Sequence, residues 1–166
     1  DLIFFLCAML VPFLHGPVRA AVLLAAPLLG GWNLYHLADG FRAVSYGFGE
    51  FNLVLMRVDS LSLFFAILFH LVAFIAILYS LHVRSAMRLT WPLLYGGSAL
   101  GAIFAGDMIT LFIFWELMAV ASSVLIFASR RPNARGAAVR YLLVQATSGL
   151  ILLGGDRKST CLNSSH

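Results

Sequence analysis

The chain has 166 residues, of which 61% are hydrophobic and 11% are charged, and its formal net charge is +4. A soluble domain carries about 25% charged residues, so this composition excludes an ordinary soluble domain and indicates an outer surface in contact with lipid. The charges cluster between apolar runs, which is typical of membrane topology rather than of nucleic-acid binding.

Six apolar segments follow one another along the chain, and several reach the ~20 residues that a helix needs to cross a bilayer. They cover about residues 2–14, 17–37, 59–82, 90–105, 107–127 and 134–155. Asp59 or Ser60 can cap the third segment. Asp107 begins the fifth, where a carboxylate meets the positive end of the helix dipole. The sequence predicts an all-α fold, a polytopic transmembrane bundle of about six helices.

The connections between these segments predict the topology. The stretch SYGFGEFNLVLMRVD, before the third segment, alternates weakly and predicts a small hairpin on the outer face. Basic residues gather in the first, third and fifth connections, namely Arg19, then Arg84 and Arg88, then Arg130, Arg131 and Arg135. Because cytoplasmic loops carry an excess of Lys and Arg, we expect these connections to be cytoplasmic and the N-terminal end to lie outside.

The two ends of the sequence both look cut. Residues 156–166, DRKSTCLNSSH, break off abruptly from the apolar run before them. They look like the translation of a sequencing adapter, and we expect them to be a non-native tail. The chain also begins without methionine, so the sequence is interpreted as a fragment of a longer protein.

One acidic residue interrupts the fifth segment. In GDMITLFIFWELMAV, Glu116 comes nine residues after Asp107. At ~1.5 Å per residue it lies roughly 14 Å deep, close to the bilayer midplane. Hydrocarbon disfavours a charged carboxylate unless a cation is near, so we expect Glu116 to take up and release protons in a relay. The alternative is a neutral, hydrogen-bonded glutamate at a helix contact.

Other polar residues lie within the apolar segments. His70 is in the middle of the third, and an imidazole changes charge near neutral pH, so it is a candidate second relay group. It could equally be hydrogen-bonded between helices. Gln145, Thr147 and Ser148 of the sixth segment either line a hydrated path or bridge neighbouring helices.

Gly97 and Gly101 form a small-xxx-small ridge on the fourth segment, which favours close helix packing. The sequence has no glycine-rich phosphate loop, metalloprotease motif or nucleophile elbow. We therefore expect no cofactor and no bound metal.

Three stretches resemble a known family. MRVDSLSLFFAILFHLVAFIAILYSLHV resembles the third-helix region of the proton-translocating antiporter-like subunits, AGDMITLFIFWELMAVASSVLI the fifth helix, and ARGAAVRYLLVQATSGLILLGG the sixth. Glu116 matches the key glutamate of that fifth helix. The family includes the D-type subunit of Mrp-type Na⁺/H⁺ antiporters and the antiporter-like subunits of respiratory complex I. The phrases RVDSLSLFFAILFH and AGDMITLFIFWEL favour the D-type branch.

The resemblance implies that residues 1–155 are the N-terminal part of an NADH:quinone oxidoreductase/Mrp antiporter transmembrane domain. It implies about fourteen helices in inverted repeats, and a lysine on the seventh helix that tunes the proton affinity of the glutamate. Only the glutamate can be transferred to this chain, since its single lysine, Lys158, lies in the suspected tail.

The leading interpretation is thus a proton-translocating subunit of a hetero-oligomeric Na⁺ or K⁺/H⁺ antiporter in a bacterial cytoplasmic membrane. This would be a secondary transporter rather than an enzyme. One alternative is a proton-pumping subunit of complex I or of a membrane-bound hydrogenase, with the redox site in other subunits. Another is a non-transporting membrane scaffold in which Glu116 is structural.

Overall fold

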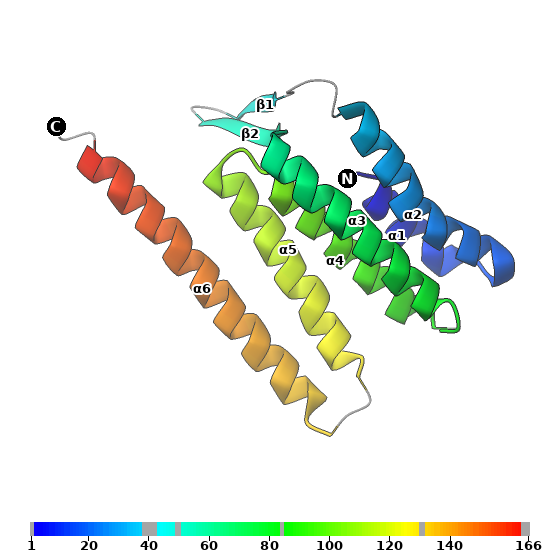
Figure 1. Ribbon diagram of the computed structural model, residues 1–166. Helices are drawn as coiled ribbons and strands as arrows, with labels where there is room; N and C mark the ends of the chain where they lie inside the picture. The colour runs from blue at the N-terminus through cyan, green and yellow to red at the C-terminus, as the bar shows by residue number, and fades with distance from the viewer. Residues whose placement is uncertain (1, 38–42, 49–50, 84, 130–131, 164–166) are drawn as a thin grey trace.

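The computed structural model describes residues 2–37, 43–48, 51–83, 85–129 and 132–163, which form six α-helices, a short 3-10 helix (η1) and one β-hairpin (Figure 1). The elements are α1 (Leu2–Leu10), η1 (Val11–Phe13), α2 (Gly16–Leu37), β1 (Ala43–Phe48), β2 (Phe51–Arg57), α3 (Ser60–Ser80), α4 (Ala86–Phe104), α5 (Met108–Phe127) and α6 (Ala134–Asn163). Arg84, Arg130 and Arg131 lie outside the described residues. The predicted transmembrane helix bundle is confirmed.

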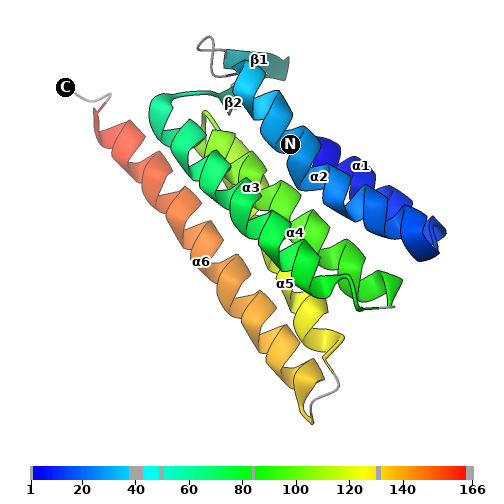
Figure 2. The same cartoon turned by 45° about the vertical axis from the view of Figure 1, so that its right-hand side comes forward.

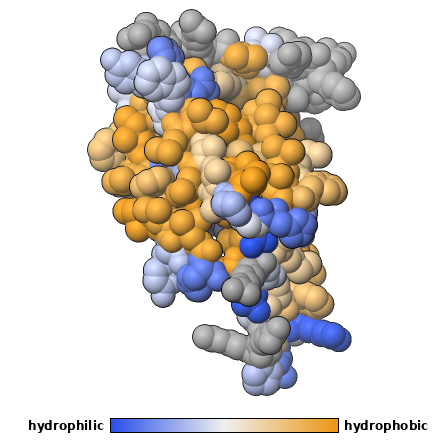
Figure 3. Space-filling model, turned by 90° about the vertical axis from the view of Figure 1, so that its right-hand side faces the viewer, coloured by the Kyte–Doolittle hydropathy of each residue, from blue (hydrophilic) through white to orange (hydrophobic). Residues whose placement is uncertain are grey.

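Four helical stretches are long and apolar enough to cross a membrane: α2, α3, α5 and residues 134–155 of α6. Figure 3 shows a broad apolar surface over the middle of the molecule, with hydrophilic residues gathered above and below it. Such a band is expected where the surface contacts the hydrocarbon of a bilayer.

Helix α4 is not among the four stretches that are long and apolar enough to cross a membrane, and its position inside the bundle explains why. Nine of its 19 residues are buried, because it packs against α1, α3 and α5. A helix enclosed by other helices needs small residues for packing more than it needs an apolar outer face. In Figures 1 and 2, α6 lies at one edge of the bundle and α1 and α2 lie at the other.

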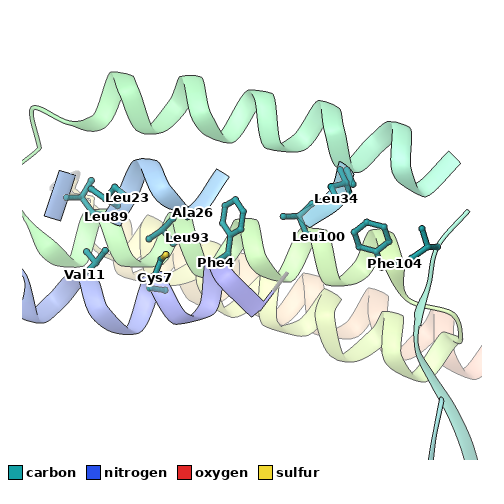
Figure 4. Packing of buried hydrophobic residues seen from close by; sticks show 13 residues of the cluster. Phe4, Cys7, Val11, Leu23, Ala26, Leu34, Leu89, Leu93, Leu100 and Phe104 are labelled. Atoms are coloured by element: carbon teal, nitrogen blue, oxygen red, sulfur yellow. The ribbon is translucent and has the colours of Figure 1, made fainter. Parts of the chain in front are cut away.

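The apolar core lies on the α1, α2, α3 and α4 side of the molecule. Figure 4 shows Phe4, Cys7 and Val11, from α1 and η1, packed beside leucines of α2 and α4. A Cβ added to Gly97 would lie 3.1 Å from Phe4 Cβ, so the glycine allows α1 to approach α4 closely. A Cβ at Gly101 would overlap the ring of Phe114 on α5.

The predicted boundaries hold with two differences. Helix α4 begins at Ala86, not near Thr90, because Pro92 is accommodated inside the helix at its seventh residue. There the proline removes one helical hydrogen bond without ending the helix. The second difference is that α6 continues past residue 155, where the apolar segment ends, to Asn163.

The hairpin and the helix caps are confirmed. Strands β1 and β2 pair antiparallel between α2 and α3. Asp59 and Ser62 form a reciprocal capping box at the start of α3. Asp107 caps α5 by accepting a hydrogen bond of 2.8 Å from the Thr110 amide.

Candidate functional site

Glu116 lies near the middle of α5, and its side chain is half-buried. It is the only acidic residue within the four stretches that can cross a membrane. Its Oε1 atom is buried and accepts no hydrogen bond from any described residue. Buried polar atoms almost always have a partner. Among the described residues, this oxygen is therefore an unsatisfied polar atom at the contact between α5 and α6.

The carboxyl group of Glu116 faces the backbone of α6 at Gly149. A Cβ added to Gly149 would lie 2.8 Å from Glu116 Oε1 and 3.0 Å from Phe112 Cε2. Any larger residue at this position would push the two helices apart or displace the carboxyl group. Gly149 thus keeps α6 close to Glu116, a role that the sequence alone did not reveal.

Helix α6 contacts α5 through a narrow stripe of its surface. The stripe repeats at three- and four-residue spacing, so its members share one helix face. It includes Ala134, Ala138, Tyr141, Gln145 and Gly149, all buried or half-buried. We call these five residues, with Glu116 and Ser122 of α5, the α5–α6 seam.

The seam also holds a hydrogen bond between the two helices. Ser122 Oγ and Tyr141 Oη are 3.1 Å apart. The bond lies toward the C-terminal end of α5 from Glu116, with Gln145 at an intermediate height on α6. The seam is therefore polar over about two helical turns, in contrast to the apolar core beside α4.

The other predicted residues of α6 are placed differently. Thr147 donates a hydrogen bond of 2.7 Å to the Leu143 carbonyl, and Ser148 donates one of 2.9 Å to the Gln145 carbonyl. Both residues are exposed and bond their own helix in this structure. Gln145, on the seam, is the member of the predicted trio that lies on the same face as Gly149.

His70 is separated from Glu116. It is 5% exposed on α3, its Nδ1 lies 2.7 Å from the Ala66 carbonyl oxygen, and its ring makes an edge contact with Phe4. Among the described residues α3 does not pack on α5, because α4 lies between them. The structure therefore does not bring the two predicted relay residues together.

The N-terminal end of α5 is attached to the hairpin. Asp107 accepts a hydrogen bond of 2.7 Å from the Val54 amide of β2, and the Gly106 amide donates one of 2.9 Å to the Val54 carbonyl. Burial raises the pKa of Asp107, but hydrogen bonds from Thr110 and Val54 outweigh this and leave the pKa below its ordinary value. The hairpin thus fixes the end of the helix that carries Glu116.

Metal chelation has no support in the described part of the chain, where no three His, Cys, Asp or Glu side chains lie close enough to hold an ion. The fold and the seam together define a class: a polytopic helical membrane protein with one carboxyl group at a contact between two spanning helices.

Comparison with known proteins shows which members of this class the chain is similar to. Residues 105–155, which include α5 and most of α6, match the family described as "NADH:quinone oxidoreductase/Mrp antiporter, TM". Over 91% of its length the chain is 29% identical to the A-type subunit of the Na⁺/H⁺ antiporter of Alkalihalophilus pseudofirmus. Over 60% it is 32% identical to the A1-type subunit of the Na⁺/H⁺ antiporter of Staphylococcus aureus strain JH9. These findings support the antiporter-like family.

The fold has a solved counterpart in the membrane-bound sulfane sulfur reductase, an archaeal respiratory membrane complex. One of its chains superposes on 92% of this chain with a TM-score of 0.71 and 19% identity. This likeness concerns the fold alone. The chain spans 21% of the Alkalihalophilus relative, 13% of the Staphylococcus relative and 34% of the reductase chain.

Proposed function

We propose that this chain forms part of a proton-translocating subunit of a monovalent cation/proton antiporter of the Mrp type, with Glu116 as the group that binds and releases the proton. The observation that carries the proposal is the buried, unpartnered carboxyl oxygen of Glu116 against Gly149. Protonation neutralises this carboxyl group and so lowers the cost of burying it without a partner, and release of the proton leaves a charge that must be stabilised from elsewhere. This alternation is what a relay group requires.

Two observations bear on the type of antiporter subunit, and they favour different types. The phrases around Asp59 and Asp107 favour the D type, whereas both antiporter relatives are of the A type. Because those relatives are matched over long stretches, we favour an A-type protein within the same family. Na⁺ or K⁺ would be the exchanged cation, and the other subunits of a hetero-oligomeric antiporter would be its partners.

We further propose that the protein lies in a bacterial cytoplasmic membrane with its N-terminal end outside. The N-terminal ends of α4 and α6, whose first turns contain Arg88 and Arg135, lie at one end of the bundle, and the hairpin lies at the other (Figure 1). The positive-inside rule places the arginine end in the cytoplasm. The hairpin and Asp107 are then on the outer face.

The test is Glu116→Gln in the antiporter that contains this chain. Groups that transfer protons contribute about a hundredfold or more in rate, so Na⁺- or K⁺-driven proton movement in everted vesicles should be abolished. The control is Asp59→Asn, which removes the same charge at a helix cap outside the spanning stretch. Both proteins are quantified in the membrane. Unchanged proton movement in the Glu116→Gln protein would leave the scaffold interpretation standing and end this proposal.

A redox-driven proton pump is the second candidate, favoured by the matched family description, which names NADH:quinone oxidoreductase beside the Mrp antiporter. It would use the same carboxyl group with a different energy source. Vesicles that move protons after addition of an electron donor, but not after addition of Na⁺ or K⁺, would support the pump over the antiporter.

A further inference from the structure

A cavity of about 230 Å³ lies between α3 and α4, with Phe4 of α1 and Leu23 of α2 also in its lining. It is separate from the α5–α6 seam, since neither α5 nor α6 contributes to it. Its inner wall is formed by buried apolar side chains, among them Leu89 and Leu93. Val72, on its rim, is 55% exposed, so the cavity is open to the surface that contacts lipid.

The cavity extends from one end of α3 toward the middle of the bilayer. Its lining on α3 extends from Phe69 to Ser80, the last residue of that helix. Eleven residues of helix rise by about 16 Å, which is close to half of the ~30 Å hydrocarbon core. An apolar cavity that begins at a helix end and stops near the midplane fits an acyl chain from a single leaflet.

The open end of the cavity carries a positive charge. Arg88, in the first turn of α4, is part of the lining and is exposed. The one ion pair among the described residues joins Arg57 to Asp59, so Arg88 has no acidic partner in this part of the chain. Ser80 lies at the same end, where its hydroxyl group donates a hydrogen bond of 2.8 Å to the Ala76 carbonyl. A guanidinium group at headgroup depth beside an apolar cavity is complementary to an anionic lipid.

From these observations we infer that the cavity between α3 and α4 binds an anionic phospholipid, with the phosphate on Arg88 and one acyl chain along Phe69, Val72 and Leu93. The inference is independent of proton transport. The lipid would fill the space between these two helices.

The experiment is a lipid titration followed by native mass spectrometry. The protein is purified in detergent, stripped of lipid, and titrated with phosphatidylglycerol or phosphatidylcholine with the same acyl chains. An arginine near the membrane surface contributes about 1 kcal/mol to anionic lipid binding, so Arg88→Gln should weaken phosphatidylglycerol binding about fivefold and leave phosphatidylcholine binding unchanged. The control is Arg135→Gln, at the same end of the bundle but outside this cavity.

A second variant tests the acyl-chain part of the site. Ala76→Phe places a ring in the cavity from its exposed rim and should reduce binding of both lipids, with the thermal unfolding temperature as a check on folding. Equal phosphatidylglycerol affinity in the wild-type and Arg88→Gln proteins would overturn the headgroup contact. Undiminished binding by a folded Ala76→Phe protein would overturn the acyl-chain site. Displacement of the lipid by glycerol 3-phosphate would identify a free phosphate as the ligand and reject the lipid.

Discussion

The two sides of α4 are packed with different kinds of side chain. On the side of α1, α2 and α3, large apolar groups fill the space, and Phe4, Val11 and Leu100 are almost completely buried. On the far side, no residue of α5 or α6 belongs to the apolar core, and the buried positions of these helices are alanine, glycine, serine and threonine.

The difference shows where a membrane protein can hold a carboxyl group. A core of large apolar side chains would leave Glu116 without hydration or partners, at a cost of several kcal/mol. The α5–α6 seam instead brings two backbones close together at Gly149 and places Gln145, Tyr141 and Ser122 along the same contact, although none of them hydrogen-bonds Glu116 Oε1 in this structure. In the proposed function, the apolar side supports the bundle and Glu116 on the seam is the group that binds and releases the proton.

The largest effect is expected from damage to the apolar side. Phe4→Ala removes a ring that packs closely against Gly96 of α4 and makes an edge contact with the ring of His70. Loss of a buried phenylalanine costs about 3 kcal/mol or more, so the thermal unfolding temperature in detergent should fall markedly. Phe13→Ala is the control, since that ring is 80% exposed. A similar fall in both variants would mean that the buried cluster does not dominate stability.

The seam is tested by adding a single methyl group. Gly149→Ala places a Cβ 2.8 Å from Glu116 Oε1, and overpacking of this kind costs about 1–3 kcal/mol. We expect cation-driven proton movement to fall more than stability does, because the carboxyl group itself must shift.

The matched control for the seam is Gly154→Ala on the same helix, where an added Cβ meets no atom within 4 Å. Proton movement in everted vesicles and unfolding temperature are measured for both proteins. Equal proton movement in the two variants would separate Gly149 from the function of Glu116.

A smaller effect is expected where the hairpin meets α5. The lowered pKa of Asp107 means that its carboxylate stabilises the folded state above its unfolded pKa of about 3.9, and that this contribution is lost as the pH falls through the lower folded value. Cleavage of the hairpin by pepsin should therefore increase at the acidic end of a series from pH 5 to pH 2.

Asp107→Asn should weaken the attachment of the hairpin by at most about 1 kcal/mol, as for a substituted helix cap, and should flatten this pH dependence. Asp59→Asn is the comparison, because its carboxylate accepts from Ser62 within α3 and not from the Val54 amide. If the steep response to acid persists in the Asp107→Asn protein, another group attaches the hairpin.

The sequence predicted those features that depend on neighbouring residues. Apolar runs bounded by charges gave all six helices, and acidic residues just before such runs gave the caps at Asp59 and Asp107. The position of Glu116 near the middle of α5 followed from counting residues along the helix. Each of these inferences needs only local geometry, which is why it survives in the folded chain.

The contacts between helices were not predictable in the same way. Gly149 is 33 residues from Glu116, and their contact depends on how α5 and α6 cross. The enclosed position of α4 likewise depends on which helices surround it. A signal for the seam was present, because small and polar residues recur every three or four positions from Ala134 to Gly149. Many membrane helices carry such spacing, so it could not identify the partner.

The smallest effect on stability is expected from the hydroxyl pair of Ser122 and Tyr141, at the end of the seam away from Glu116. Ser122→Ala removes the contact with Tyr141, and hydrogen bonds between membrane helices contribute about 0.6 kcal/mol on average. Ser129→Ala is the control, since that hydroxyl bonds the Ile126 carbonyl of its own chain segment. A double-mutant cycle with Tyr141→Phe, measured by thermal unfolding, isolates the pair. Coupling between the two hydroxyls would show that a polar contact helps to hold α6 to α5 at the Ser122 end of the seam. Strict additivity would leave the close approach at Gly149 as the main contact that positions α6 against Glu116.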